Sequence, residues 1–291
     1  MPKQSLVLCF FFLFFSLYSL AQDTTIYMQP IEIIDTAISF DATKLNQFDS
    51  DGKKHGYWKE YYVDVNKKMR YQGQFNHGTP IGLFNNYYNT GVLKAQMNYF
   101  NEGRNAAAHL YYPTGKIMAM GLYHEQKKDS LWRYYQQEGY LVADEFYRNA
   151  QKNGPAQVYQ ENGSVLEESN WVNDKQDGIW KQFYPNTTKP KFIMHYKNGL
   201  REGSAQFFYE SGAMKGTGFY EGSHRDSVWI YYQEDGGLQQ QIIYKNGTKI
   251  NTFIPDNIKK EKAKEDTMMG DKKIENIEEL DDKLQPFIDK Y

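Results

Sequence analysis

Six histidines and one short acidic run are the residues of this chain whose chemistry could hold a metal ion. The histidines are His55, His77, His109, His124, His195 and His224. They fall at different positions of the repeat described below, so we do not expect the repeat to gather them into a metal cluster. The run Asp49-Ser50-Asp51-Gly52 is similar to the start of a calcium loop, but its glycine is misplaced and Lys53 occupies a ligand position. The sequence therefore predicts no metal site and no cofactor.

Catalytic motifs are missing from the sequence as well. It contains no phosphate-binding glycine loop, no nucleophile elbow and no paired-histidine motif. Its single cysteine, Cys9, lies in a segment that we expect to be removed, so the mature chain would have neither a thiol nucleophile nor a disulfide. The carboxylates are scattered through turn-like segments. We expect a protein that is not an enzyme and has no catalytic residues.

The overall charge excludes two classes of partner. The formal net charge is −2, so no strong positive field attracts nucleic acid or an anionic membrane. We therefore expect no nucleic-acid partner and no strong membrane binding. A small-molecule ligand is left unspecified.

Residues 1–21 have the pattern of a secretory signal peptide. Lys3 precedes an almost wholly apolar run, Leu6 to Leu20, and a small-x-small cleavage site ends at Ala21. The alternative, a membrane anchor, needs about 20 apolar residues, and this run is shorter. We expect cleavage before Gln22 and secretion, which would place the mature protein in the periplasm, the cell envelope or the extracellular space.

Residues 22–47 form a short polar extension that precedes the repeats. One strand-like run, Ile31 to Ile34, could add an edge strand to the structure that follows.

A repeat of about 24 residues fills residues 48–254. Each of its eight units starts at a small residue, which we call the opening residue. The opening residues are Gly56, Gly82, Ala106, Ser130, Gly154, Gly178, Gly203 and Ser227. Small residues suit a place where the backbone has an unusual φ or approaches another backbone.

Three further positions keep the same register in every unit. Five residues after the opening residue stand the fifth-position aromatics, Tyr61, Tyr87, Tyr111, Tyr135, Tyr159, Phe183, Phe208 and Tyr232. Two residues after it stand the tryptophan-position residues, Trp58, Phe84, Ala108, Trp132, Ala156, Trp180, Ala205 and Trp229. Each unit ends in a closing aromatic, namely Phe75, Tyr99, Tyr123, Tyr147, Trp171, Tyr196, Tyr220 and Tyr244.

Runs of about six residues rich in Tyr, Trp and Phe, bounded by Gly and Asn, predict β-hairpins. An isolated hairpin cannot bury its apolar face, so neighbouring hairpins should stack side by side. The predicted fold is all-β, an elongated single-layer antiparallel sheet of about eight consecutive hairpins.

Strand alternation predicts which side chains share a face. Ala95, Met97 and the closing aromatic Tyr99 should share a face with the fifth-position aromatics, while the tryptophan-position residues point the other way. Bulges near the glycines could reverse this assignment.

Two roles compete for the aromatic side chains. For the fifth-position aromatics we expect a structural ladder of cross-strand packing. For the tryptophan position, packing and partner binding are equally weighted, and the candidate binding residues are Trp58, Phe84, Trp132, Trp180 and Trp229.

The pattern Gly-x-Trp-x-x-Tyr-Tyr, followed by a turn glycine and a closing tyrosine before Asn-Gly, resembles the MORN (membrane occupation and recognition nexus) repeat. It is most similar to the bacterial variant of proteins labelled as antitoxins of toxin–antitoxin systems. The resemblance covers about 200 residues and implies consecutive antiparallel hairpins with scaffolding and binding roles.

Residues 255–291 form a charged tail with few aromatics. Ile274, Ile277, Leu280, Leu284 and Phe287 recur at helical spacing and predict a short amphipathic helix. The helix could cap the repeats, bind a partner or remain solvated.

The sequence thus favours a secreted, non-enzymatic repeat scaffold that mediates protein–protein interaction. One alternative, drawn from the resemblance, is an antitoxin or immunity-like protein that neutralises a cognate toxin. The other is a cell-envelope protein that binds or hydrolyses carbohydrate, because aromatic strips also suit sugar rings.

Overall fold

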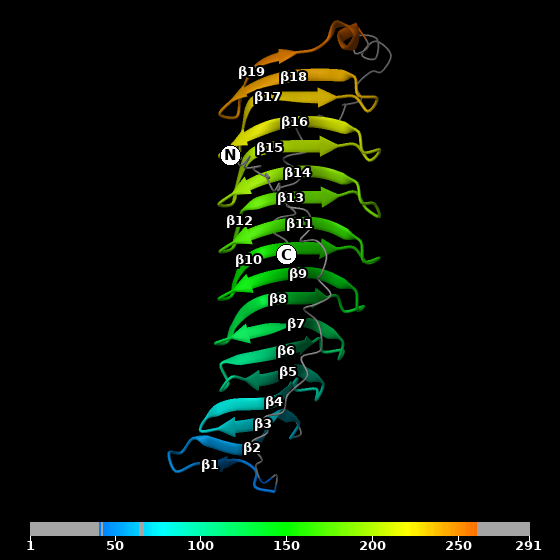
Figure 1. Ribbon diagram of the computed structural model, residues 1–291. Coiled ribbons are helices and arrows are strands. Elements are labelled where there is room, and N and C mark those ends of the chain that lie inside the picture. The colour runs from blue at the N-terminus through cyan, green and yellow to red at the C-terminus, as the bar shows by residue number, and fades with distance from the viewer. Residues whose placement is uncertain (1–40, 42, 64–66, 261–291) are drawn as a thin grey trace, which may run out of the picture. The chain divides into compact units, whose positions relative to one another are not determined.

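The computed structural model describes residues 41, 43–63 and 67–260 of the 291-residue chain. Within these residues the chain forms one open antiparallel sheet of nineteen strands (Figure 1). The strands are β1 (Gln47–Phe48), β2 (Lys54–Tyr61), β3 (Met69–Asn76), β4 (Thr79–Tyr87), β5 (Leu93–Phe100), β6 (Asn105–Tyr111), β7 (Ile117–His124), β8 (Lys127–Tyr135), β9 (Leu141–Arg148), β10 (Gln151–Tyr159), β11 (Val165–Val172), β12 (Lys175–Gln176), β13 (Gly178–Phe183), β14 (Pro190–Lys197), β15 (Leu200–Phe208), β16 (Met214–Glu221), β17 (His224–Tyr232), β18 (Leu238–Lys245) and β19 (Thr248–Phe253).

The strands follow one another in the sheet in the order of the sequence. The first unit is the hairpin β2–β3 and the eighth is β17–β18. The flanking strands β1 and β19 pair with β2 and β18. The predicted all-β, hairpin-by-hairpin sheet is confirmed.

The described part of the chain ends after the repeats. Residues 256–260 form a helical turn, in which Ile258 is buried. The signal peptide, the strand at Ile31 to Ile34 and the amphipathic helix at 274–287 lie outside the described residues.

The closing aromatics do not lie on the face that strict strand alternation predicts for them. Ala108 and Gly121 are directly paired and therefore share a face. The closing aromatic Tyr123 lies on that face too, because its ring contacts that of Trp132 at 4.9 Å. The tryptophan-position residues and the closing aromatics thus form one surface, which we call the tryptophan face. The prediction that the closing aromatics share a face with the fifth-position aromatics was wrong.

A β-bulge in every unit accounts for this difference. In the third unit the pairing of β6 with β7 shifts register between Leu110 and Tyr111, immediately at the fifth-position aromatic. The same shift occurs at that position in the other seven units. A bulge adds a residue to one strand and reverses the faces of the residues that follow. The fifth-position aromatics therefore lie on the opposite surface, which we call the tyrosine face.

A second bulge accompanies most opening residues. Gly154, for example, has a φ of 126°, and the pairing of β9 with β10 shifts register beside it. Ser130 adopts a φ of 58° at the same place in its unit, at some cost for a residue with a side chain. Ala106 has no positive φ, and β5 pairs with β6 without any register shift. A small opening residue is therefore needed where the backbone turns, and alanine serves where it does not.

Large rings on the tryptophan face lie against glycine on the neighbouring strand. A Cβ atom added to Gly121 would stand 2.4 Å from the ring of Trp132, and one added to Gly218 would stand 2.1 Å from that of Trp229. The absence of a side chain at these glycines lets each ring lie flat on the preceding hairpin. Each of these two glycines is paired with a small tryptophan-position residue, Ala108 or Ala205, so a pair of small residues stands before each of the two rings.

A tyrosine next to the fifth-position aromatic links consecutive units. Its hydroxyl group donates a hydrogen bond to the backbone carbonyl of the fifth-position aromatic in the next unit. The five links run from Tyr62 to Tyr87, from Tyr88 to Tyr111, from Tyr112 to Tyr135, from Tyr184 to Phe208 and from Tyr209 to Tyr232. Gln136, Gln160 and Gln233 hold this position in the other units.

We expect Tyr112→Phe to lower the free energy of unfolding by about 0.5–1.5 kcal/mol, the usual contribution of one hydrogen bond. The variant keeps the ring and removes only the hydroxyl group that bonds to the Tyr135 carbonyl at 2.9 Å. Urea denaturation followed by circular dichroism measures the change. Tyr140→Phe, at an exposed turn residue, is the control and should be neutral. Equal effects of the two variants would contradict the inter-unit link.

Candidate binding surface

The tryptophan-position residues are buried in all eight units. Their exposed fractions are 8% for Trp58, 7% for Phe84, 2% for Ala108, 0% for Trp132, 8% for Ala156, 3% for Trp180, 0% for Ala205 and 0% for Trp229. A ring with no exposed surface cannot contact a partner without moving. The binding role of Trp58, Phe84, Trp132, Trp180 and Trp229 stays a prediction, and their burial favours the packing role.

Basic side chains lie over aromatic rings of the tryptophan face, some at the tryptophan position and some among the closing aromatics. The side chains belong to the residue two positions before the opening residue. Lys54 Nζ lies 4.5 Å from the ring centre of Trp58, Lys128 Nζ 4.8 Å from that of Trp132, Lys152 Nζ 5.0 Å from that of Trp171, Arg201 Cζ 4.6 Å from that of Tyr220 and Arg225 Cζ 4.8 Å from that of Trp229. Cations over aromatic faces are attracted by the ring quadrupole, more strongly where water is excluded.

A chain of polar contacts crosses the tryptophan face in the fourth and fifth units. Lys128 Nζ donates to the Tyr134 hydroxyl at 2.8 Å, which donates to the Tyr147 hydroxyl at 3.1 Å. Tyr147 in turn donates to Glu145 Oε2 at 2.5 Å, and Lys152 Nζ donates to Glu145 Oε1 at 2.6 Å. Both oxygens of the Glu145 carboxylate are therefore occupied by donors.

Burial shifts the pKa values in this network. Desolvation lowers the pKa of Lys128, despite the opposing charge of Glu145. It also raises the pKa of Tyr134 to about 12 and raises that of Tyr147 further, with the hydrogen bond to Glu145 acting in the same direction. Both tyrosines are neutral donors at physiological pH. The network is suited to holding the rings and cations in place.

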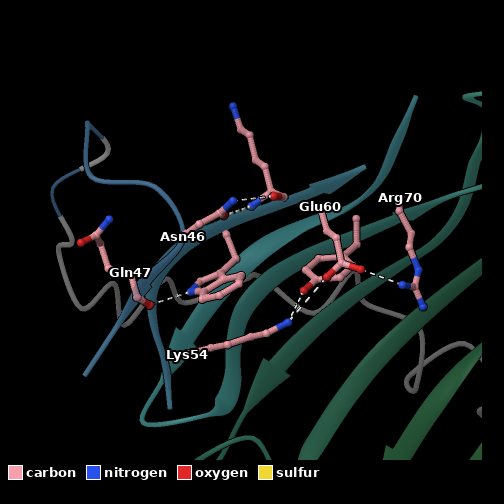
Figure 2. Close-up of polar contacts among 8 residues, drawn as sticks. Asn46, Gln47, Lys54, Glu60 and Arg70 are labelled. Carbon is pink, nitrogen blue, oxygen red and sulfur yellow. Dashed lines mark hydrogen bonds and ion pairs between the residues drawn. The ribbon is translucent and has the colours of Figure 1, made fainter. Parts of the chain in front are cut away.

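The first unit contains a related group of charges at the edge of the sheet. Glu60 lies between Lys54, at 3.7 Å, and Arg70, at 2.6 Å (Figure 2). Lys54 Nζ also donates to the Tyr71 hydroxyl at 2.5 Å. The indole N–H of Trp58 donates to the carbonyl of Gln47, which fastens β1 to this unit.

The tyrosine face carries three rows of accessible side chains. The first row is the fifth-position aromatics, of which Tyr61 is exposed and the others are half-buried. The second is a polar row of directly paired residues in the middle of the strands, mainly Gln72, Asn85, Gln96, His109, Arg133, Asp144, Gln157, Glu168, Lys181, Gln206, Thr217 and Gln241. The third is an apolar row comprising Leu83, Leu122, Leu131, Phe146, Ile179, Phe219, Val228 and Ile243.

The polar row is most strongly charged at its centre. Arg133 binds Asp144 through two nitrogens, at 2.9 and 3.2 Å. The Tyr159 hydroxyl donates to Gln157 at 2.8 Å, and Lys181 binds Glu168 at 3.2 Å. Desolvation, and next the charge of Asp144, raises the pKa of Tyr159 to about 12. These groups can exchange hydrogen bonds with a partner while the strands hold them in fixed register.

The apolar row is the exposed hydrophobic part of this face. Leu83, Ile179, Phe219, Val228 and Ile243 have exposed fractions of 40–46%. Val228 and Ile243 are directly paired, so they form a continuous patch in the eighth unit. Apolar surface beside tyrosines and adaptable polar groups is typical of protein-binding surfaces.

The structure brings two histidines together, although the repeat does not align them. One ligand atom each of Asp49, His55 and His77 lies within 4.8 Å of the other two. The resemblance of the run from Asp49 to Gly52 to a calcium loop stays a sequence observation. In the structure, Asp49 Oδ1 accepts the backbone N–H groups of Asp51 and Lys53, at 2.9 and 2.8 Å.

Sequence reasoning missed the basic residues over the rings and the apolar row. The basic residues were visible as a pattern, because Lys54, Arg104, Lys128, Lys152, Arg201 and Arg225 all stand two positions before an opening residue. Half of the apolar row directly follows an opening residue and the other half directly precedes a closing aromatic. After the other opening residues the sequence has Tyr, Ala, Pro or Ser, which weakens the signal.

A family model described as a MORN repeat variant matches residues 80–101, 152–173, 201–221 and 225–246. These segments coincide with the second, fifth, seventh and eighth hairpins, so the matched repeat and the structural unit are the same. The chain carries MORN repeats. MORN repeats suggest a scaffold for interaction with proteins or membranes.

Solved structures resemble this MORN-repeat chain weakly. The crystal structure of TcdB2–TccC3 is 12% identical, with a TM-score of 0.21, over 72% of this chain and 14% of that chain. A Photorhabdus luminescens Tc holotoxin pore is 14% identical, with a TM-score of 0.21, over 72% of this chain and 13% of that chain. The chain thus spans a small part of either, and no curated protein matches it. Among the described residues, no helix is long and apolar enough to cross a membrane.

Proposed function

We propose that this MORN-repeat protein is a secreted, non-enzymatic scaffold that binds a partner protein through its tyrosine face. The observation that carries the proposal is the alignment of three different rows on that face. Tyrosines offer large contact area at low entropic cost, the polar row offers hydrogen bonds, and the apolar row offers surface that gains by leaving water.

The regular spacing of the rows supports a protein partner. Strands in a sheet lie about 4.7–4.9 Å apart, so each row repeats every two strands, about 9–10 Å. An extended partner segment could contact the same three kinds of side chain at several consecutive units. Repeat arrays commonly use such long surfaces for binding.

Two sequence features support the remaining parts of the proposal. The apolar run and cleavage pattern of residues 1–21 support secretion. The lack of a phosphate-binding glycine loop, a nucleophile elbow and a paired-histidine motif in the sequence supports a non-enzymatic role.

Site-specific cross-linking tests the proposed binding surface. A photo-reactive amino acid is placed at Ile179 or at Val228 in the apolar row, and at Glu161 in an exposed turn as the control. The mature protein is then incubated with the envelope and secreted fractions of its own cells. We expect the same protein to be cross-linked from Ile179 and Val228, and not from Glu161.

A charged double variant supplies the second measurement. Ile179→Asp with Val228→Asp should weaken capture of that protein by at least about tenfold, which equals 1.4 kcal/mol. Circular dichroism confirms that the variant remains folded. Unchanged capture by a folded double variant, or equal cross-linking from the turn, would refute the tyrosine-face proposal.

The same experiments separate the alternatives. A captured toxin encoded beside this chain would support the antitoxin role. Binding to a glycan array, or to liposomes without any protein, would point to carbohydrate or membrane recognition instead.

A further inference from the structure

The edge of the sheet brings together three side chains that can bind a metal. Asp49 follows β1, His55 lies at the start of β2, and His77 lies in the turn between β3 and β4. Gln47 in β1 pairs with His55, and the backbone N–H of Gly78 donates to the carbonyl of Lys54 at 2.8 Å. Backbone pairing therefore holds all three segments side by side.

Asp49 is held in a fixed orientation and is nearly covered. Its side chain is 7% exposed, its Oδ1 accepts the backbone N–H groups of Asp51 and Lys53, and its Oδ2 lies 2.7 Å from His77 Nδ1. A carboxylate whose orientation is already fixed by hydrogen bonds from the backbone is preorganised to bind a metal ion.

The two imidazoles are adjacent. The ring centres of His55 and His77 lie 4.9 Å apart, and the backbone N–H of His77 points to His55 Nδ1 at 3.4 Å. His77 is 61% exposed, so its ring has room to turn toward an ion.

Comparison within the chain shows that the repeat does not require histidine here. In the eighth unit the same two positions are Asp226 and Asn246, and the Asn246 backbone N–H donates to Asp226 Oδ2 at 3.1 Å. In the fifth unit they are Asn153 and Asn173, whose side chains bond at 2.9 Å. The turn residue has a positive φ in each case, 46° for His77 and 48° for Asn246. Asparagine thus meets the structural need, and the histidine pair adds metal-binding capacity.

We propose that Asp49, His55 and His77 form a site for a divalent transition-metal ion, with Zn²⁺ as the best match. Two imidazole nitrogens and one carboxylate oxygen are a ligand set that zinc prefers, with a fourth position left for water or another ligand. Zinc holds such ligands at about 2.0–2.2 Å, which places them about 3.3–3.5 Å apart. The ligand atoms now lie up to 4.8 Å apart, and Asp49 Oδ2 and His77 Nδ1 are in direct contact at 2.7 Å. Binding would therefore require the side chains to rotate so that the longer separations shorten and this contact lengthens.

A bound ion would tie β1, β2 and the β3–β4 turn together. β1 is two residues long and pairs with the sheet through Gln47 and Phe48. An ion that binds the folded edge and not the unfolded chain stabilises that edge by mass action. The bound ion would therefore cross-link these three segments and stabilise the N-terminal edge of the sheet.

Zinc titration of the untagged mature protein tests the site. After treatment with a chelator, the protein is titrated with ZnCl₂ by isothermal calorimetry, and its thermal unfolding is recorded with and without Zn²⁺. We expect one equivalent of Zn²⁺ to bind and to raise the unfolding temperature.

Variants taken from the fifth unit provide matched substitutions that should fold. The double variant His55→Asn with His77→Asn reproduces the asparagine pair of that unit, and His77→Asn alone replaces one of its members. Both variants should weaken Zn²⁺ binding at least about tenfold. They should also abolish the thermal shift. His109→Ala, at an exposed histidine on the tyrosine face, is the control and should leave binding unchanged.

Two outcomes would overturn the proposal. Failure of the wild-type protein to bind Zn²⁺ is the first. Equal weakening by His109→Ala and by His77→Asn is the second, because it would indicate general surface binding.

Discussion

Trp132→Ala is expected to lower the free energy of unfolding by about 3–5 kcal/mol, the usual cost of removing a large buried ring. Trp132 has an exposed fraction of 0%, and its indole N–H donates to the Leu122 carbonyl at 3.0 Å. The substitution would leave a cavity above Gly121 and would remove this hydrogen bond. Urea denaturation followed by circular dichroism measures the loss, with the exposed Tyr140→Ala as the control.

A double-mutant cycle identifies the contact responsible. Gly121→Ala places a Cβ atom 2.4 Å from the Trp132 ring and should cost about 1–3 kcal/mol by overpacking. In the Trp132→Ala background the same change should cost much less, because the ring is gone. Strictly additive effects would show that the ring does not lie on this glycine.

Glu145→Ala is the second substitution with a large expected effect, about 2–3 kcal/mol. The variant leaves Lys152 and Tyr147 without their acceptor and leaves Lys128 without a nearby negative charge. Breaking a fully buried ion pair costs about 3–5 kcal/mol. The expected loss is smaller here because the side chains of Lys152 and Glu145 are 23% and 15% exposed.

The matched control for Glu145 is Glu102→Ala. Glu102 is 90% exposed and forms a 3.9 Å ion pair with Arg104, so its removal should cost less than about 1 kcal/mol. Thermal unfolding of both variants at the same ionic strength makes the comparison. A loss at Glu145 no larger than that at Glu102 would show that the network contributes little to stability.

The repeat pattern was sufficient to predict the hairpins, because the opening residues and the aromatics keep their spacing in all eight units. The assignment of the closing aromatics to a face failed, since it depends on bulges that residue types do not reveal. Leu110 and Tyr111, for example, are ordinary strand-forming residue types, and nothing in their side chains indicates that the register shifts between them.

The candidate sites were less predictable than the fold. The basic residues over the rings form a visible column, but single-sequence reasoning offered no partner for them. Asp49, His55 and His77 meet because β1 pairs with β2 and because the β3–β4 turn returns to the same edge. Such proximity depends on contacts between segments that the repeat period does not describe.

The tyrosine links between units also determine how far a disturbance can spread. They join the first four units through Tyr62, Tyr88 and Tyr112, and the last three through Tyr184 and Tyr209. Each of two clusters of buried residues lies within one of these blocks. One cluster surrounds Trp132 in the first block, and the other extends from Trp180 to Tyr244 in the second.

The fifth unit lies between these two blocks and has no tyrosine link to either. Gln136 replaces the linking tyrosine of the fourth unit, and Gln160 replaces that of the fifth. The tryptophan face of the fifth unit also contains a buried polar residue, Ser169. At the boundary between the fourth and fifth units, the ion pair between Lys152 and Glu145, at 2.6 Å, takes the place of a tyrosine link. The array thus consists of two tyrosine-linked blocks joined partly by a charged contact. High salt should therefore weaken this junction more than it weakens the neutral tyrosine links within each block.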